Sequence, residues 1–242
     1  MAARGERAVP AEQILRDLRI NRIFEGSTEI MHLLIAREAV DAHLAAAGAL
    51  ADQDSSVGDK AKAAAKASGF YAKWFPKLVA GQGTVPTSYG EFGDLAKHLR
   101  FVERSSRKLA RQTFYGMSRW QARMEYHQSF LGRIVDIGAE LFAMSASVSR
   151  AEMIRQDDPD QGAAAYDLAD AFCRQSRVRV EELFGRLWTN TDDVDGRIAD
   201  RVLDGDFVWL EDGIIDQSEG TGPWISTWEP GPSKGESLAR RY

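Results

Sequence analysis

The sequence predicts an all-α protein from three observations. Apolar residues recur at steps of three and four along most of the 242 residues, which places them on one face of a helix. No segment alternates apolar and polar residues in the manner of a half-buried strand. No repeat of fixed length is present. We therefore expect a helical hairpin, a bundle of helices after it and an irregular tail.

The composition indicates a globular chain. Hydrophobic residues make up 44% of the sequence and aromatic residues 10%, which is sufficient for a buried core. The net charge of -5 argues against general nucleic-acid binding, because such binding needs an excess of Lys and Arg. Cys173 is the only cysteine, which excludes an intrachain disulfide and a cysteine metal cluster.

Nothing in the sequence predicts a membrane-spanning or secreted protein. No apolar run approaches the roughly 20 residues that a spanning helix needs. The first residues, MAARGERAVPAEQ, lack the apolar core of a signal peptide. We expect a cytoplasmic protein.

The first helix of the hairpin is expected from Pro10 to about Phe24. Proline is tolerated in the first turn of a helix, and an apolar face follows. This face consists of Ile14, Leu15 and Leu18. Gly26 then interrupts the pattern and predicts a tight loop.

The second helix is expected to begin at Ser27 or Thr28, since either hydroxyl is a good N-cap, and to reach about Ala49. Its apolar face consists of Leu33, Ala36, Val40 and Leu44. We assign this hairpin to a domain of residues 1–50. The polar, turn-rich residues 51–59 are the predicted linker to the next domain.

A helical bundle is expected over residues 60–205. Its first helix runs from Lys60 to Val79, and four glycines and a proline then interrupt regular structure at 81–93. A long helix is expected from Asp94, with a bend near Gly116. Its apolar stripe is Leu95, Leu99, Val102, Leu109, Trp120 and Met124.

Two further stripes complete the predicted bundle. The first ends near Gln156 and contains Leu131, Ile134, Leu141 and Val148. The second contains Ala165, Leu168, Phe172, Val180, Leu183 and Leu187. Amphipathic helices with short connections are typical of a bundle. A last helix is expected from Asp192 to Leu203, before an irregular Gly/Pro/Trp-rich tail at 206–242.

The loop of the hairpin contains a candidate catalytic base, Glu25. A carboxylate beside Ile23 and Phe24 can be partly desolvated, which raises its pKa and strengthens it as a base. The helix that follows offers backbone N–H groups and a positive dipole end to an anion or a carbonyl oxygen. A base and an electrophilic group would then be neighbours in the sequence.

The segment RDLRINRIFEGSTEIMHLLIAREAV, from Arg16 to Val40, resembles the signature of the acyl-CoA dehydrogenases. In that signature an arginine-rich helix runs into an aromatic-Glu-Gly-Thr turn, and a helix bearing Ala-Arg-Glu follows. The one departure in the turn is Ser27, where threonine is usual, and the hydroxyl is retained. The predicted bundle is compatible with the C-terminal helical extension of very-long-chain members.

The resemblance implies roles for six residues. Glu25 resembles the base that removes the α-proton of an acyl-CoA thioester while the β-hydrogen passes as hydride to FAD. The backbone of Gly26 is implied to lie against the substrate, and Arg37 near the coenzyme A moiety, roughly 13 Å along the helix from the loop. Three residues match positions that contact FAD: Ser27, Thr28 and Glu29.

The resemblance also implies partners. The flavin-binding body of the family, a helical domain and a β-domain, should precede this segment. We therefore expect a C-terminal piece of such an enzyme, whose FAD site is incomplete unless another segment or chain supplies that body. The expected substrate is an acyl-CoA, and the expected assembly is a homodimer.

Two other motifs have structural explanations. Glu219-Gly220-Thr221 repeats the Glu-Gly-Thr string, but no helical pattern follows it, and Trp224 and Trp228 beside it are expected to pin the tail. Glu29-x-x-His32 has the spacing of a di-iron ligand pair, but no second copy exists. We expect His32 to be a partly buried helix residue, and we expect no metal site.

A basic stripe is expected on the long helix, formed by Lys97, Arg100, Arg104, Arg107, Lys108 and Arg111. Such stripes are usually solvated or paired with acidic neighbours, here Glu181 and Glu182. The alternative is a peripheral membrane contact through acidic lipid headgroups. Two functions therefore stay open: the C-terminal part of an FAD-dependent acyl-CoA dehydrogenase, and a non-catalytic helical interaction module.

Overall fold

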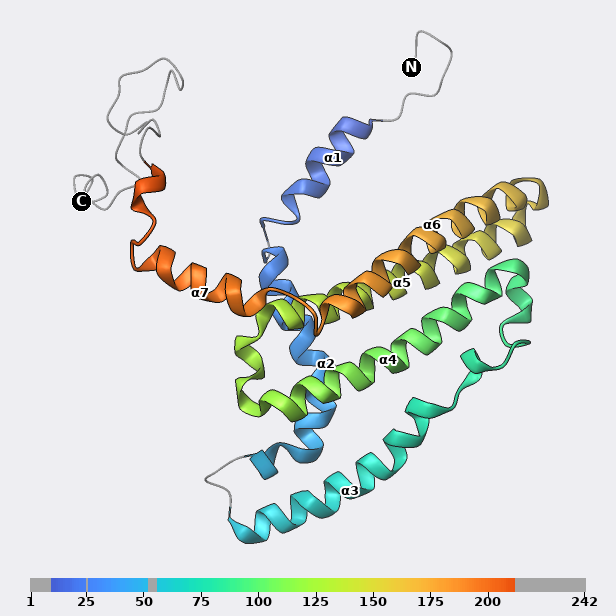
Figure 1. The fold of residues 1–242 in the computed structure, drawn as a ribbon. Coiled ribbons are helices and arrows are strands. Elements are labelled where there is room, and N and C mark those ends of the chain that lie inside the picture. Colours follow the sequence, from blue (N-terminus) through green and yellow to red (C-terminus); the bar gives the residue numbers. More distant parts are fainter. Residues whose placement is uncertain (1–9, 25, 52–55, 212–242) are drawn as a thin grey trace, which may run out of the picture. The chain divides into compact units, whose positions relative to one another are not determined.

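The computed structural model describes residues 10–24, 26–51 and 56–211, and all elements in these ranges are helices (Figure 1). The all-α prediction is confirmed. The chain divides into two compact units, one ending at Asn190 and the other beginning at Thr191. The predicted boundary at 51–59 lies within the first unit, and residues 52–55 of it lie outside the described ranges.

The two helices around the loop are α1 (Ala11–Ile20) and α2 (Thr28–Ala51). After α1 the chain makes one more turn, in which the N–H of Phe24 donates to the carbonyl of Ile20 at 2.9 Å. Helix, tight loop and helix thus follow in the predicted order. The predicted apolar face of α1 is exposed, because Leu15 and Leu18 are 67% and 59% accessible.

The hairpin partner of α2 is α3 (Val57–Val79), which begins three residues before the predicted start. Ser56 caps α3 by accepting the N–H of Asp59 at 3.1 Å. An aromatic cluster joins α2, α3 and the long helix Ala96–Trp120, which contributes Phe114. It surrounds the buried His43 and contains Phe70, Tyr71, Trp74, Phe75 and Phe114.

The segment after α3 contains the 3-10 helices η2 (Gln82–Thr84) and η3 (Gly90–Leu95), and α4 (Ala96–Trp120) follows. Arginines of α4 donate to carbonyls of this segment and of the end of α3. The three bonds are Arg100 to Ser88 at 2.8 Å, Arg104 to Gly83 at 2.6 Å and Arg111 to Leu78 at 2.6 Å. The predicted irregularity at 81–93 is therefore ordered by the helix beside it.

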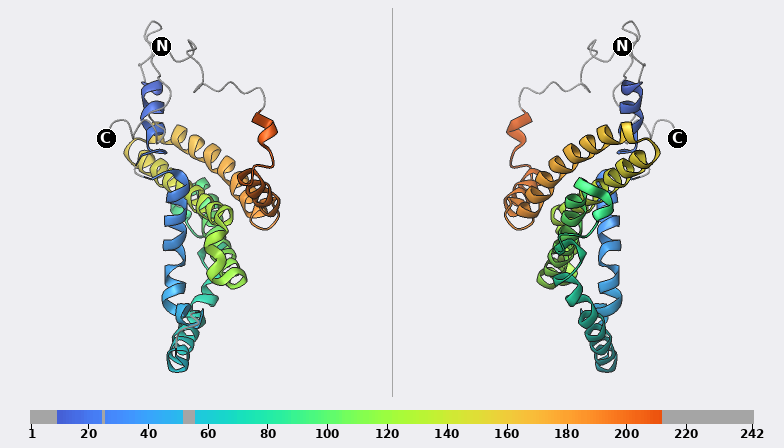
Figure 2. Two further views of the ribbon diagram at one scale, coloured as in Figure 1. Left: turned by 90° about the vertical axis from the view of Figure 1, so that its left-hand side faces the viewer. Right: turned by 90° about the vertical axis from the view of Figure 1, so that its right-hand side faces the viewer.

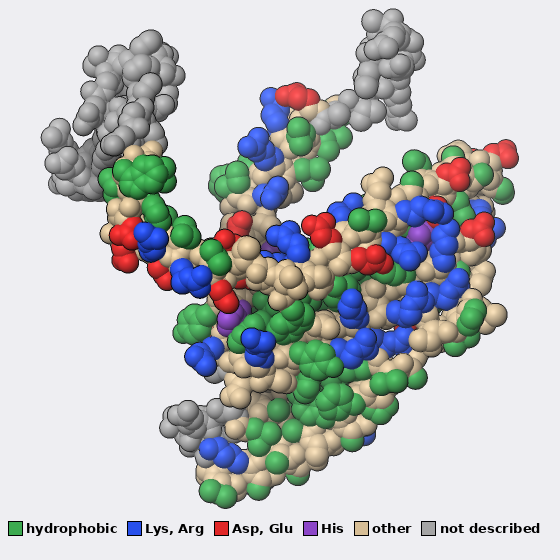
Figure 3. Space-filling view, in the orientation of Figure 1, with side chains coloured by type: hydrophobic (Ala, Val, Ile, Leu, Met, Phe, Trp, Pro, Cys, Tyr) green, Lys and Arg blue, Asp and Glu red, His purple; other side chains and the backbone are tan. Residues whose placement is uncertain are grey.

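The rest of the basic stripe also has partners within the chain. Lys97 pairs with Asp170 at 2.7 Å, and Arg107 pairs with Glu103 at 2.7 Å, in place of the predicted Glu181 and Glu182. The ammonium group of Lys108 lies 4.1 Å from the ring centre of Phe184. Figure 3 shows the Lys and Arg side chains gathered over this part of the first unit.

The core of the first unit lies among α4, α5 (Gln128–Asp157) and α6 (Pro159–Arg186), with α2 against α5 (Figures 1 and 2). Its most buried apolar side chains include Ile137, Met144, Val148, Cys173 and Val180. The stripes predicted along α5 and α6 form this core. Its burial is the main stabilising contribution to the bundle.

The long helix that was predicted from Asp94 is divided into α4 and a following 3-10 helix. α4 continues unbroken through Gly116 and ends at Trp120, where Gln121 has a φ of 50° and the 3-10 helix η4 (Gln121–Tyr126) begins. Gly116 has a packing role, since a Cβ there would lie 2.7 Å from the ring of Phe130.

The second unit contains α7 (Asp192–Leu203), with the predicted bounds, and η5 (Val208–Glu211). The apolar side chains of α7 are exposed, among them Val194, Ile198 and Val202. Residues 212–242 lie outside the described ranges, and with them Glu219, Gly220, Thr221, Trp224 and Trp228. Within the described residues, no helix combines the length and the apolar character needed to cross a bilayer.

Candidate functional site

The loop between α1 and α2 carries the predicted base. Glu25 itself lies outside the described residues, while Phe24 and Gly26 on either side are described. Gly26 has a φ of +116°, a backbone conformation that side chains with a Cβ rarely adopt. The glycine of the motif is therefore required by the turn, whatever the role of its neighbours.

The first turn of α2 gathers the three predicted FAD-contacting residues. The carbonyl of Ser27 accepts the N–H of Met31 at 3.0 Å, which starts the helix, and Thr28 Oγ1 accepts from Arg22 Nε at 3.5 Å. Glu29 follows in the same turn. A backbone N–H and the Ser27 hydroxyl bond its carboxylate and lower its pKa. The start of α2 thus stabilises negative charge.

The surroundings of the loop are apolar and open. Ile23 and Phe24, which were predicted to desolvate the base, are 67% and 65% accessible. Exposed side chains of α2 extend this area, and we call the whole the loop-side apolar surface: Ile23, Phe24, Ile30, Met31, Leu34 and Ile35. Desolvation of a carboxylate in the loop would require a further segment or chain to cover this surface.

Arg37 lies on α2 beyond the loop. One unbroken helix links Thr28 to Arg37, so the expected separation of roughly 13 Å along the axis applies. Arg37 is exposed, whereas its neighbour Ala36 is buried against the bundle. The structure therefore brings residues 26–29 together and leaves Arg37 apart from them.

His32 has a partner that the sequence does not predict. Its Nε2 lies 3.2 Å from Oδ1 of Asp136 on α5. The side chain is partly buried, with 26% accessible. Across the described residues, no cluster of three or more His, Cys, Asp or Glu side chains is arranged to hold a metal ion. His32 thus contributes a contact between α2 and α5.

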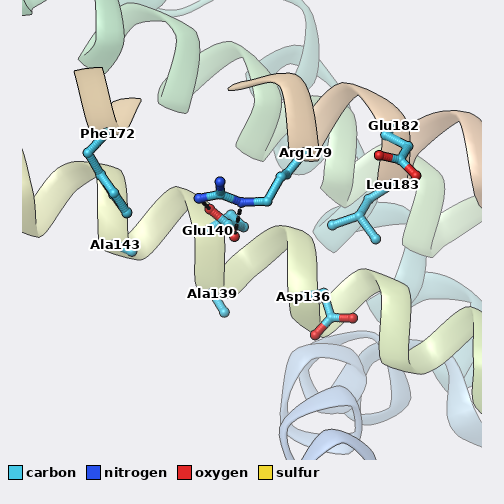
Figure 4. A pocket seen from close by; sticks show the side chains of 8 residues that line it. All are labelled: Asp136, Ala139, Glu140, Ala143, Phe172, Arg179, Glu182 and Leu183. Carbon is cyan, nitrogen blue, oxygen red and sulfur yellow. Dashed lines mark hydrogen bonds and ion pairs between the residues drawn. The ribbon is translucent and has the colours of Figure 1, made fainter. Parts of the chain in front are cut away.

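A groove with a volume of about 510 Å³ runs between α5 and α6 (Figure 4). The guanidinium group of Arg179 lies across it and bonds Glu140 at 2.7 Å and 3.0 Å, which lowers the pKa of that carboxylate. Its remaining lining consists of Asp136, Ala139, Ala143, Phe172, Glu182 and Leu183. None of the described site residues lines this groove.

The start of α2 offers hydrogen-bond donors to a group bound beside it. The N–H groups at the start of a helix have no carbonyl ahead of them, and the Thr28 hydroxyl stands beside them, while the Ser27 hydroxyl and one backbone N–H bond the Glu29 carboxylate. Such donors suit the carbonyl oxygens of a flavin ring. The described residues form no enclosed cavity here, because the loop-side apolar surface is open.

Comparison with known proteins gives one consistent result. Over all 242 residues the chain is 69% identical to the C-terminal part of proteins named probable acyl-CoA dehydrogenase FadE10, from Mycobacterium tuberculosis and Mycobacterium bovis. The chain spans 37% of the length of these relatives. No family model matches it. The resemblance to the C-terminal portion of an acyl-CoA dehydrogenase is therefore confirmed over the whole chain.

Proposed function

We propose that the chain functions as the C-terminal part of an FAD-dependent acyl-CoA dehydrogenase, which dehydrogenates acyl-CoA thioesters between Cα and Cβ in fatty-acid β-oxidation. The observation that carries the proposal is the 69% identity over the whole chain to proteins named as probable acyl-CoA dehydrogenases. The motif from Arg16 to Val40 lies at a helix-loop-helix junction, where a base and a helix start can act together.

In this proposal Glu25 accepts the α-proton of the thioester. Gly26 lets the substrate approach the backbone, and Arg37 contacts the coenzyme A moiety with its guanidinium group. The first turn of α2 holds one edge of FAD through Ser27, Thr28 and Glu29. FAD, when bound, supplies the acceptor of the β-hydrogen as hydride.

The proposal requires a cover for the loop-side apolar surface. Apolar surface of this extent is typical of an interface. We infer that a flavin-binding body, equivalent to the remaining part of the relatives, covers it and excludes water from Glu25. Water exclusion would raise the pKa of the carboxylate and make it a stronger base. A homodimer would bury further apolar surface.

A chimeric enzyme, called the joined enzyme below, tests the proposal. It consists of the Mycobacterium tuberculosis relative with its C-terminal part replaced by this chain. We expect the joined enzyme to bind FAD and to transfer electrons from palmitoyl-CoA or octanoyl-CoA to an artificial acceptor. A joined enzyme that folds, binds FAD and oxidises neither substrate would contradict the proposed function.

The second candidate is a non-catalytic helical interaction module, including a peripheral membrane contact. The exposed apolar face of α7, with Val194, Ile198 and Val202, favours it. The basic stripe of α4 is an argument against lipid binding, because its side chains already have partners within the chain. The module predicts binding to anionic vesicles at low salt that weakens at high salt, and an inactive joined enzyme.

A further inference from the structure

The helix that follows the catalytic loop packs against the bundle core near the loop and against α3 farther along, around His43. Leu33, Ala36 and Val40 of α2 pack against the core, and Ala36 is 2% accessible. On this side, one turn nearer the loop, His32 Nε2 lies 3.2 Å from Asp136 Oδ1. Figure 4 shows Asp136 on α5, beside the faint blue ribbon of α2.

Gly132 and Asp136 form the contact surface for His32 on α5, which we call the seat. Gly132 lies one helical turn before Asp136, and a Cβ at this position would be 3.3 Å from His32 Nδ1. That contact is tighter than most side chains make. The glycine therefore lets the imidazole lie close to α5, while Asp136 bonds its far nitrogen.

The seat lies close to the residues that the proposed function needs. His32 is three residues after Glu29, hence one turn from it on the same helix. The opposite neighbour of the loop, α1, has an exposed apolar face. The start of α2 is therefore linked to α5 through His32, and to the segment before the loop through the 3.5 Å bond from Arg22 Nε to Thr28 Oγ1.

We propose that Gly132 and Asp136 are positioning residues for the dehydrogenation. Through His32 they hold the turn with Ser27, Thr28 and Glu29, and the loop before it, in the orientation that proton removal requires. The bundle then contributes to the rate of the reaction as well as to stability. This inference rests on the proposed function.

The test is Asp136→Leu in the joined enzyme, because leucine keeps the size and removes the acceptor. We expect kcat and the exchange of the substrate α-proton with D2O to fall by about 5-fold to about 100-fold. KM should stay within about twofold, since neither His32 nor Asp136 contacts the substrate in this proposal, and kcat is compared at full FAD occupancy. Asp136→Asn keeps an oxygen acceptor and should restore most of kcat.

Glu140→Leu is the matched control. Glu140 lies one turn after Asp136 on α5 and bonds Arg179 of α6 at 2.7 Å, whereas Asp136 bonds His32 of α2. This variant should lose thermal stability without losing kcat. An equal fall in kcat for Glu140→Leu would overturn the inference, because bundle stability alone would then explain both variants.

Gly132→Ala is a second variant, which keeps the test possible if Asp136→Leu does not fold. Alanine favours the helical state over glycine, so Tm should not fall, while the added methyl group displaces His32 and kcat decreases. Unchanged kcat in both Asp136→Leu and Gly132→Ala would overturn the inference and leave the proposed function intact. If the unsubstituted joined enzyme binds FAD without oxidising substrate, the proposed function fails and the inference fails with it.

Discussion

His98 of α4 and Asp170 of α6 form a partly buried bond, with Nε2 of the histidine 2.8 Å from Oδ1 of the carboxylate. The His98 side chain is fully buried, and its Nδ1 has no partner within the described residues. Lys97, His98 and Arg174 all bond Asp170 and hold the pKa of that carboxyl well below its usual range. One acidic side chain thus joins two helices of the core.

Asp170→Ala should lower the free energy of unfolding by about 1–3 kcal/mol, because both nitrogens of His98 then lie buried without a partner. Urea unfolding measures the change. Asp167→Ala, at an exposed position on the same helix, is the matched control and should change stability by less than about 0.5 kcal/mol. Equal effects of the two substitutions would contradict the stabilising role of the His98–Asp170 bond.

His43 should make the chain less stable in mild acid. Burial among aromatic rings lowers its pKa below the ordinary value of 6.5. The unfolded chain therefore binds more protons below pH 6.5, and the free energy of unfolding falls as the pH decreases. Burial lowers the pKa of His98 as well, so the two histidines act in the same direction.

His43→Phe should reduce this pH dependence, since phenylalanine suits the aromatic cluster and does not titrate. Urea unfolding at pH 7.5 and pH 5.5 compares the two proteins, and the substituted one should lose less stability in acid. Equal losses for both proteins would show that His43 does not contribute to the acid sensitivity.

Gly116→Ala should destabilise the chain by about 1–3 kcal/mol, because the added methyl group would lie 2.7 Å from the ring of Phe130. Gly69→Ala is the matched control on α3, since nothing lies within 4 Å of its added Cβ. That variant should gain about 0.5–1 kcal/mol from helix propensity. Thermal unfolding separates the two cases, and a stabilised Gly116→Ala would contradict the close packing.

The sequence predicted those features that depend on local spacing. The helix Asp192–Leu203 has its predicted bounds, and the start of α2 at Thr28 follows from the hydroxyls of the motif. The break at Gln121 was missed, because a non-glycine residue with positive φ leaves no sign in the apolar pattern. The spacing of apolar residues therefore predicts that a helix is present better than it predicts the residue at which the helix ends.

The contacts between distant segments could not be predicted. His32 was correctly predicted as partly buried, but its partner Asp136 lies on α5, and no spacing rule connects the two. The arginines of α4 were predicted as solvated or ion-paired. Arg100 and Arg104 instead donate to backbone carbonyls of the preceding segment, which only the tertiary structure brings near.

The role of Glu25 remains the central prediction, and exchange of the substrate α-proton in D2O by the joined enzyme tests it most directly. Glu25→Gln should abolish both exchange and dehydrogenation while FAD stays bound, because glutamine cannot accept the proton. Glu219→Gln, in the other Glu-Gly-Thr string, should leave both unchanged. Retained α-proton exchange in Glu25→Gln, or its loss in Glu219→Gln alone, would contradict the assignment of the base.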